Sequence, residues 1–197
     1  MLNKKLIPFL SAVILCFFVT TILAQESTAA KPRKHKFTLY AGAGPNVYFN
    51  NLALAKDYVK EINYSFAGRF MWEPEHNLSL GIESGYYCLY TVDFKEQSDV
   101  NIKNAAIPIQ LVVCMKFLKH FYFSFASGQS ILMNDITQTL NGDISASTIS
   151  LGDFAGSLGY KWDLKERFSL GAETKFFYAS KLNDKNLALL FMVGYHL

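Results

Sequence analysis

The feature that most constrains the fold of this chain is a hydrophobic alternation with a period of two, which begins at Phe37. Its clearest instance runs from Leu78 to Tyr90, where large apolar residues occupy one phase and mainly small or polar residues the other. An amphipathic helix would repeat every 3.6 residues, so this pattern predicts a β-strand with one apolar face. The segment from Phe168 to Tyr178 repeats the pattern, and both of its charges, Glu173 and Lys175, fall in one phase.

The same alternation recurs in eight segments along the chain. The sixth segment changes phase between Leu151 and Phe154, which predicts a β-bulge near Gly152. The expected strands are 37–49, 61–72, 78–91, 105–117, 121–131, 148–162, 168–179 and 187–197.

The connections between these segments alternate strictly between short and long. Short ones cover 73–77, 118–120 and 163–167, and long ones cover 50–60, 92–104, 132–147 and 180–186. Outer-membrane barrels have this organisation, with tight periplasmic turns and longer outward loops. Segments of this length, tilted by about 45°, span roughly 25 Å, which matches the apolar band of such a barrel. We therefore predict an all-β fold, an eight-stranded antiparallel up-and-down transmembrane β-barrel in the outer membrane, surrounded by its lipid.

A soluble lipocalin-like barrel is the main alternative, because it also has eight strands but turns its apolar face inward. The charged residues of the strands count against it, since they occupy the phase opposite the large apolar residues. We expect them to form a lumenal charge network, to which Tyr40, Gln110, Tyr122 and His196 add hydrogen-bonding partners. The charged residues are Arg69, Glu83, Lys116, Asp153, Lys161, Glu173 and Lys175.

Aromatic residues gather at both ends of the expected strands, as in the two interfacial girdles of a membrane barrel. The turn-side girdle is expected to contain Trp72, Phe117, Phe121, Trp162, Phe168 and Tyr195, and the loop-side girdle Tyr48, Phe49, Tyr58, Tyr90, Phe94 and Tyr178.

The N-terminus has the features of a secretory signal peptide. Two lysines precede an apolar run that ends at Ala24, which predicts a signal peptide over residues 1–24 with cleavage between Ala24 and Gln25. An uncleaved helical anchor is the alternative. Residues 25–36 form a polar, basic linker, and residues 37–197 the barrel domain.

The charge balance argues against a nucleic-acid partner. The whole chain has a formal net charge of +3, but residues 37–197 hold 13 basic and 15 acidic side chains. A nucleic-acid-binding domain needs a basic face on the folded domain itself.

The histidines and cysteines do not indicate an enzyme, a metal site or a cofactor. The four histidines are His35, His76, His120 and His196. All of them map to the expected periplasmic end, and no two have metal-ligand spacing. Cys88 and Cys114 fall on opposite faces of their strands, so we expect two free thiols.

The interior of an eight-stranded barrel is just wide enough to be filled by side chains. A structural charge network is therefore the main expectation for the lumen, and an ion or proton path is its rival. The loops 92–104 and 132–147 are candidates for recognition, although solvated lids without a ligand fit them equally well. Their charged residues are Lys95, Glu96, Asp99, Asp135 and Asp143.

The stretch AAIPIQLVVCMKF at 105–117 is an apolar run with an internal proline that leads to a basic residue. It resembles the fourth strand of the PorT-like outer membrane β-barrel family of Bacteroidota-type bacteria. The final GYHL resembles the C-terminal strand that the outer-membrane assembly machinery reads, although it ends on Leu197 instead of the commoner Phe. The resemblance implies an outer-membrane barrel, and for PorT itself a part in protein secretion. We expect a monomeric, non-catalytic, surface-binding or envelope-structural barrel, with a small porin-like channel as the alternative.

Overall fold

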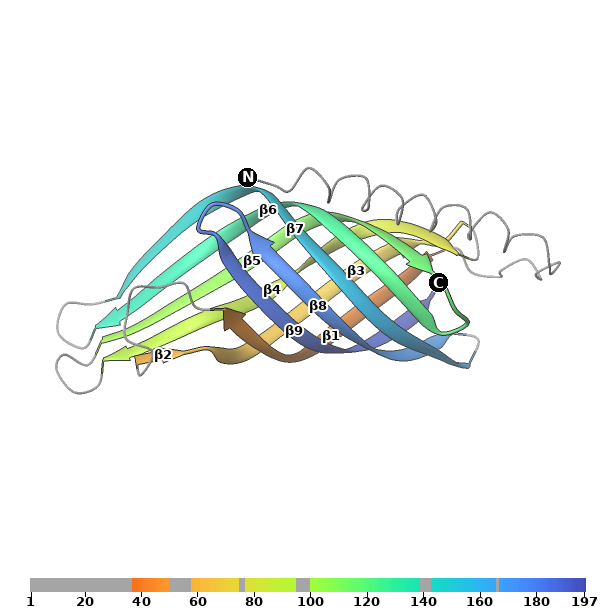
Figure 1. Cartoon of the computed structure of the whole chain (residues 1–197), viewed down its shortest axis with the longest axis horizontal. Coiled ribbons are helices and arrows are strands. Elements are labelled where there is room, and N and C mark those ends of the chain that lie inside the picture. Colours follow the sequence, from red (N-terminus) through yellow and green to blue (C-terminus); the bar gives the residue numbers. More distant parts are fainter. Residues whose placement is uncertain (1–36, 50–57, 75–76, 95–99, 139–142, 166) are drawn as a thin grey trace, which may run out of the picture. The chain divides into compact units, whose positions relative to one another are not determined.

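Eight antiparallel strands close into a barrel in the computed structural model (Figure 1). The structure describes residues 37–49, 58–74, 77–94, 100–138, 143–165 and 167–197. The expected signal peptide, its cleavage site and the linker lie outside these residues. The strands are β1 (Phe37–Phe49), β2 (Val59–Lys60), β3 (Ile62–Trp72), β4 (Leu78–Phe94), β5 (Val100–Lys116), β6 (Phe121–Gln138), β7 (Ile144–Lys165), β8 (Phe168–Ala179) and β9 (Asp184–His196).

Apart from the two-residue β2, each strand pairs with the next strand along the chain, and pairing of β1 with β9 closes the barrel. The short β2 continues β3 across Glu61, because both pair with β4 and the Glu61 carbonyl accepts a hydrogen bond from the Tyr48 amide. The two therefore count as one strand of an eight-stranded barrel. The predicted fold class is confirmed.

Strands β4 to β7 are longer than the sequence predicted, and the expected loops are correspondingly shorter. The ladder between β4 and β5 continues to Phe94↔Val100, and that between β5 and β6 to Val100↔Gln138. The expected long connections 92–104 and 132–147 are therefore wrong for most of their length. These strand ends extend beyond the apolar part of the barrel, so no lipid contact imposes an alternation on their sequence.

The predicted bulge at Gly152 is confirmed. Gly128 pairs with Asp153 and Gln129 with Leu151, so Gly152 is the extra residue, and its φ of 76° is one that glycine adopts without strain. A second irregularity lies in β4, where Cys88 pairs with Ala105 and Tyr90 with Asn104. This second irregularity was not predicted, because Leu89 is as apolar as its neighbours.

The outer face of the barrel is apolar along most of its length. Ile109, Leu111 and Phe191, for example, are 61%, 71% and 62% exposed in the isolated chain. The polar and charged residues that alternate with the apolar ones point inward and are buried. No helix in the described part of the chain is long and apolar enough to cross a membrane.

The turn-side aromatic girdle lies on the outer face as expected, with Tyr195 packed against Phe168 at 5.2 Å between ring centroids. The loop-side girdle was predicted only in part. Phe49 and Tyr58 are exposed, but Tyr48 is buried and its hydroxyl donates to Asp184 at 2.6 Å. The alternation from Asn46 onward places Tyr48 in the inward phase, and an inward carboxylate gives its hydroxyl a partner.

Candidate functional site

The centre of the lumen holds a cluster of four buried charges, two positive and two negative. Arg69 on β3 and Glu83 on β4 are direct cross-strand partners, with Nε to Oε2 at 2.7 Å. Glu173 and Lys175, two residues apart on β8, point to the same face. The Arg69 guanidinium donates to both oxygens of Glu173 at 2.9 and 3.1 Å, and Lys175 pairs with Glu83. The charges therefore cancel within the cluster.

Tyr122 on β6 completes this cluster by donating to Glu173 Oε2 at 2.7 Å. Bidentate contacts between arginine and a carboxylate are among the strongest hydrogen bonds in proteins. Burial of charge is costly unless every partner is present. The arrangement ties β3, β4, β6 and β8 together across the lumen, and its evident physical role is to fill and stabilise the barrel.

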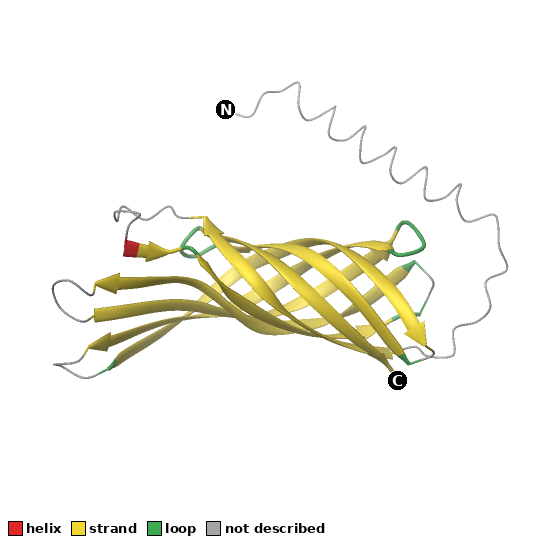
Figure 2. Cartoon of the chain, turned by 90° about the horizontal axis from the view of Figure 1, so that it is seen from below, coloured by secondary structure: helices red, strands yellow, loops and turns green. Residues whose placement is uncertain are grey.

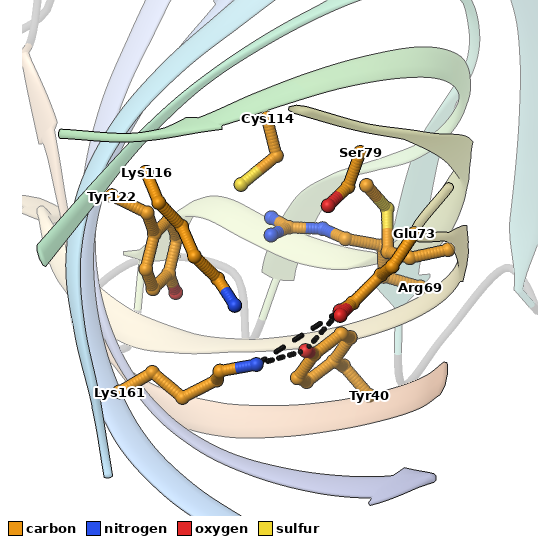
Figure 3. Close-up of a pocket in the computed structure, with 9 residues that line it drawn as sticks. Tyr40, Arg69, Glu73, Ser79, Cys114, Lys116, Tyr122 and Lys161 are labelled. Carbon is orange, nitrogen blue, oxygen red and sulfur yellow. Dashed lines mark hydrogen bonds and ion pairs between the residues drawn. The ribbon is translucent and has the colours of Figure 1, made fainter. Parts of the chain in front are cut away.

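A second group lies at the turn-side mouth of the lumen (Figure 3). The Lys161 ammonium donates to the Tyr40 hydroxyl at 2.9 Å, and that hydroxyl donates to Glu73 at 2.9 Å. Lys161 also lies 3.9 Å from Glu73 and 3.6 Å from Asp163. His196 continues the group, since it lies 3.8 Å from Asp163.

Lys116 extends from β5 toward this group and lines a cavity of about 20 Å³ between the two clusters (Figure 3). A second cavity, of about 10 Å³, lies beside Tyr40 and Tyr122. Each has room for about one water molecule. Neither is large enough for an organic ligand.

Asp153 lies apart from both groups, at the loop-side half of the lumen. Its Oδ1 accepts hydrogen bonds from the Ser150 hydroxyl at 2.6 Å and the Ser180 amide at 2.8 Å. It therefore ties the turn between β8 and β9 to β7. Of the seven charged residues expected in the lumen, four meet in the central cluster, two lie at the mouth, and Asp153 joins neither.

Two lumenal carboxylates were not predicted: Glu73 accepts a hydrogen bond from Tyr40, and Asp184 accepts one from Tyr48. Glu73 continues the inward phase of β3 by one position, and this was the signal that could have found it. Gln110, expected as a partner in the network, has an amide with no hydrogen-bond partner among the described residues.

The loop-side half of the lumen holds buried apolar side chains together with buried polar ones such as Asn46 and Asn186. The rings of Tyr87 and Phe177 stack across the lumen at 5.2 Å, and both are completely buried. Leu89, Leu132 and Leu190 belong to the same buried core. The charge cluster and, on its loop side, the stacked ring pair thus follow one another along the barrel axis.

Possible chemical sites are few in the described part of the chain. No group of three or more His, Cys, Asp or Glu side chains there could hold a metal ion. Cys88 and Cys114 are buried free thiols. His120 and His196 both lie at the turn side, whereas His35 and His76 fall outside the described residues.

An exposed apolar belt around a polar, charge-bearing interior is the inverse of a soluble barrel and the arrangement of a transmembrane one. Similar solved structures agree with this. Ail, the attachment invasion locus protein of Yersinia pestis, solved in complex with a heparin analogue, matches 83% of this chain and 99% of its own with a TM-score of 0.56 and 10% identity. Neisserial surface protein A matches 82% of this chain and 97% of its own with a TM-score of 0.52 and 12% identity.

The chain is an eight-stranded outer-membrane β-barrel. Identities this low concern the fold alone. No family model matches the chain, and no curated protein matches it. The PorT-like family therefore stays a prediction from the resemblance of residues 105–117.

Proposed function

We propose that this protein is a non-conducting, non-catalytic surface barrel that recognises an extended peptide segment at its outward end. The observation that carries the proposal is the unequal length of the strands. Figure 1 shows β4 to β7 reaching well past the β8–β9 turn at one end of the barrel, and Figure 2 gives a second view of this protruding end. Together they form a four-stranded sheet that protrudes beyond the apolar belt.

This protruding sheet ends in an unpaired edge on β7. Pairing of β7 with β8 begins only at Phe154↔Tyr178, so in the described part of the chain Ile144 to Gly152 have no strand beside them on that side. The β8–β9 turn covers part of this edge, because Ser180 and Lys181 donate to the carbonyls of Leu151 and Ile149. The turn leaves residues 144–147 of the edge uncovered, and all four are exposed.

The free part of the edge has the properties of a strand-addition site. The carbonyls of Ile149 and Leu151 point away from β6, so by alternation the N–H and C=O of Ser145 and Ser147 point the same way. Residues 144–151 carry no charge, and charge is one of the devices by which natural edges repel an added strand. An extended peptide that pairs here would gain main-chain hydrogen bonds.

A second copy in the same membrane does not fit this edge. Two such copies would be related by a two-fold axis along the membrane normal. Strands inclined by about 45° to that axis would then cross at about 90° instead of running antiparallel. The proposed occupant is therefore a segment of another protein, bound to a monomeric barrel.

The filled lumen supports recognition over the alternative of a small channel. The stacked rings of Tyr87 and Phe177 and the paired charges of Arg69 and Glu173 occupy the lumen, and the two cavities beside the charges measure only about 20 and 10 Å³. The resemblance to the PorT-like family supports a secretion-accessory role, in which the bound peptide would belong to an exported protein.

Selection of peptides on the intact protein tests the proposal. The full-length protein, in lipid nanodiscs, is exposed to a phage-displayed library of random ten-residue peptides, with empty nanodiscs for counter-selection. The key variant is Ser147→Pro, which removes an amide that faces the free edge and leaves the ladder to β6 intact. Ser147→Ala is the matched control, because it keeps that amide.

Enriched peptides are expected to bind the wild type and S147A alike and to bind S147P at least tenfold more weakly. Equal binding to S147P, or no enrichment over empty nanodiscs, would overturn the proposal. Heat-modifiable migration of each variant on unboiled gels verifies that its barrel is folded.

A further inference from the structure

Two lysines lie in one row on the outer face of the barrel, near the loop-side end of the apolar belt. Lys60 on β2 pairs with Thr91 on β4, and Thr91 pairs with Lys103 on β5. Directly paired residues share a face, and this face is the outer one because Val59 and Val92, beside the row, are buried. Strands lie about 4.8 Å apart, so the two lysine Cα atoms are about 10 Å apart. Their long side chains can converge on one small anion.

The ammonium of Lys103 is held in place by two tyrosines. It donates to the Tyr64 hydroxyl at 3.2 Å and lies 5.6 and 5.3 Å from the ring centroids of Tyr64 and Tyr86. The two rings stack at 6.1 Å. These cation–π contacts orient the charge without neutralising it.

Among the described residues, neither lysine ammonium has a carboxylate within the ion-pair distance of 4 Å. On the same face, the carboxylate of Asp93 accepts from Asn101 instead. Asp135 on β6 is the next residue in the row and pairs with Lys103. Its carboxylate accepts a hydrogen bond from Ser145 on β7, the strand on the side away from Lys103. The Tyr64 hydroxyl accepts from Lys103, so its own proton is available to an anion.

The height of this row in the membrane identifies the class of anion. Along β5, Lys103 lies 14 residues from Phe117 of the turn-side girdle, which at a tilt of about 45° is a rise of about 33 Å. The apolar belt is about 25 Å tall. The Cα of Lys103 is therefore about 8 Å above the belt, and its side chain leans back toward Tyr64 and Tyr86, to the level of the lipid headgroups.

We propose that Lys60, Lys103 and the Tyr64 hydroxyl bind a phosphate group on the headgroup of an outer-leaflet lipid. Lipid headgroups carry phosphate groups, whereas residues 37–197 carry two more acidic than basic side chains. Two lysines without a direct ion pair offset that unfavourable charge where the barrel meets the phosphates. The inference depends on the membrane placement of the barrel and is independent of peptide recognition at β7.

Binding of a defined lipid tests the site. The full-length protein is purified in detergent and titrated with a bis-phosphorylated lipid A, with the bound lipid counted by native mass spectrometry. Parallel titrations use the dephosphorylated lipid and inorganic phosphate. The variants are K60A, K103A and K60A/K103A, and the matched control is Lys119→Ala, an exposed lysine in a turn-side connection.

Each single variant is expected to weaken lipid binding about fivefold, and the double variant about 25-fold. The control and the conservative variant Lys103→Arg should bind as the wild type does. Equal binding by the double variant, an equal loss in K119A, or equal affinity for the dephosphorylated lipid would overturn the proposal. So would binding of inorganic phosphate as tight as that of the lipid, because the site would then belong to a free anion.

Discussion

Removal of Glu173 tests the central charge cluster most sharply. This carboxylate accepts two hydrogen bonds from Arg69 and one from Tyr122. Without it, Arg69 and Lys175 share the single carboxylate of Glu83, and a cluster with no net charge becomes a buried +1. Breaking a buried ion pair from one side costs about 3–5 kcal/mol. We expect Glu173→Ala to lower the free energy of unfolding by that amount.

The matched control removes both partners together. Arg69→Met with Glu173→Leu removes one contact from Glu83 and the acceptor of the Tyr122 hydroxyl, but it leaves Glu83 paired with Lys175, so no buried charge is left without an opposite charge. Replacing a buried pair by apolar residues is often neutral or stabilising, and we expect the double variant to lie within about 1 kcal/mol of the wild type. The assay is urea titration of the protein in lipid vesicles, followed by tryptophan fluorescence and heat-modifiable migration. A single variant as stable as the wild type, or a double variant as unstable as the single, would refute the reasoning.

Two further predictions concern the barrel wall. Gly152→Ala should lower the free energy of unfolding by about 1–2 kcal/mol, because a side chain is strained at a φ of 76°. Gly156→Ala is the control, since no atom lies within 4 Å of a Cβ added there. It should change the free energy of unfolding little in the same urea titration. Leu111→Lys should cost about 2–4 kcal/mol, because Leu111 lies near the middle of the apolar belt. Thr137→Lys, on the protruding sheet, should be neutral, and an equal loss in both would contradict the membrane placement.

The membrane-spanning part of the fold could be predicted from the sequence because lipid imposes a strict rule there. A strand between lipid and a polar lumen must alternate apolar and polar residues. The inward orientation of Arg69 and Glu83 could therefore be predicted without a structure. The bulge was readable for the same reason, since an extra residue at Gly152 shifts the phase.

The protruding sheet and the partners within the lumen could not be predicted in this way. The strand ends near Val100 and Thr137 have water on one or both sides, so these parts of the strands carry no alternation. The pairs that join distant strands, such as Tyr48 with Asp184, depend on barrel register, which a single sequence does not encode locally. The alternation in the sequence shows which residues face the lumen. Only the register between strands shows which of these residues contact one another.

The measurement that tests the account most directly is the conductance of the refolded full-length protein in a planar lipid bilayer. Insertion is verified beforehand by heat-modifiable migration. Stacked Tyr87 and Phe177 above the paired Arg69 and Glu173 should block the lumen, and we expect no steady current at any holding potential. Stepwise current that falls as the permeating ion grows larger would contradict the filled lumen and make the protein a channel.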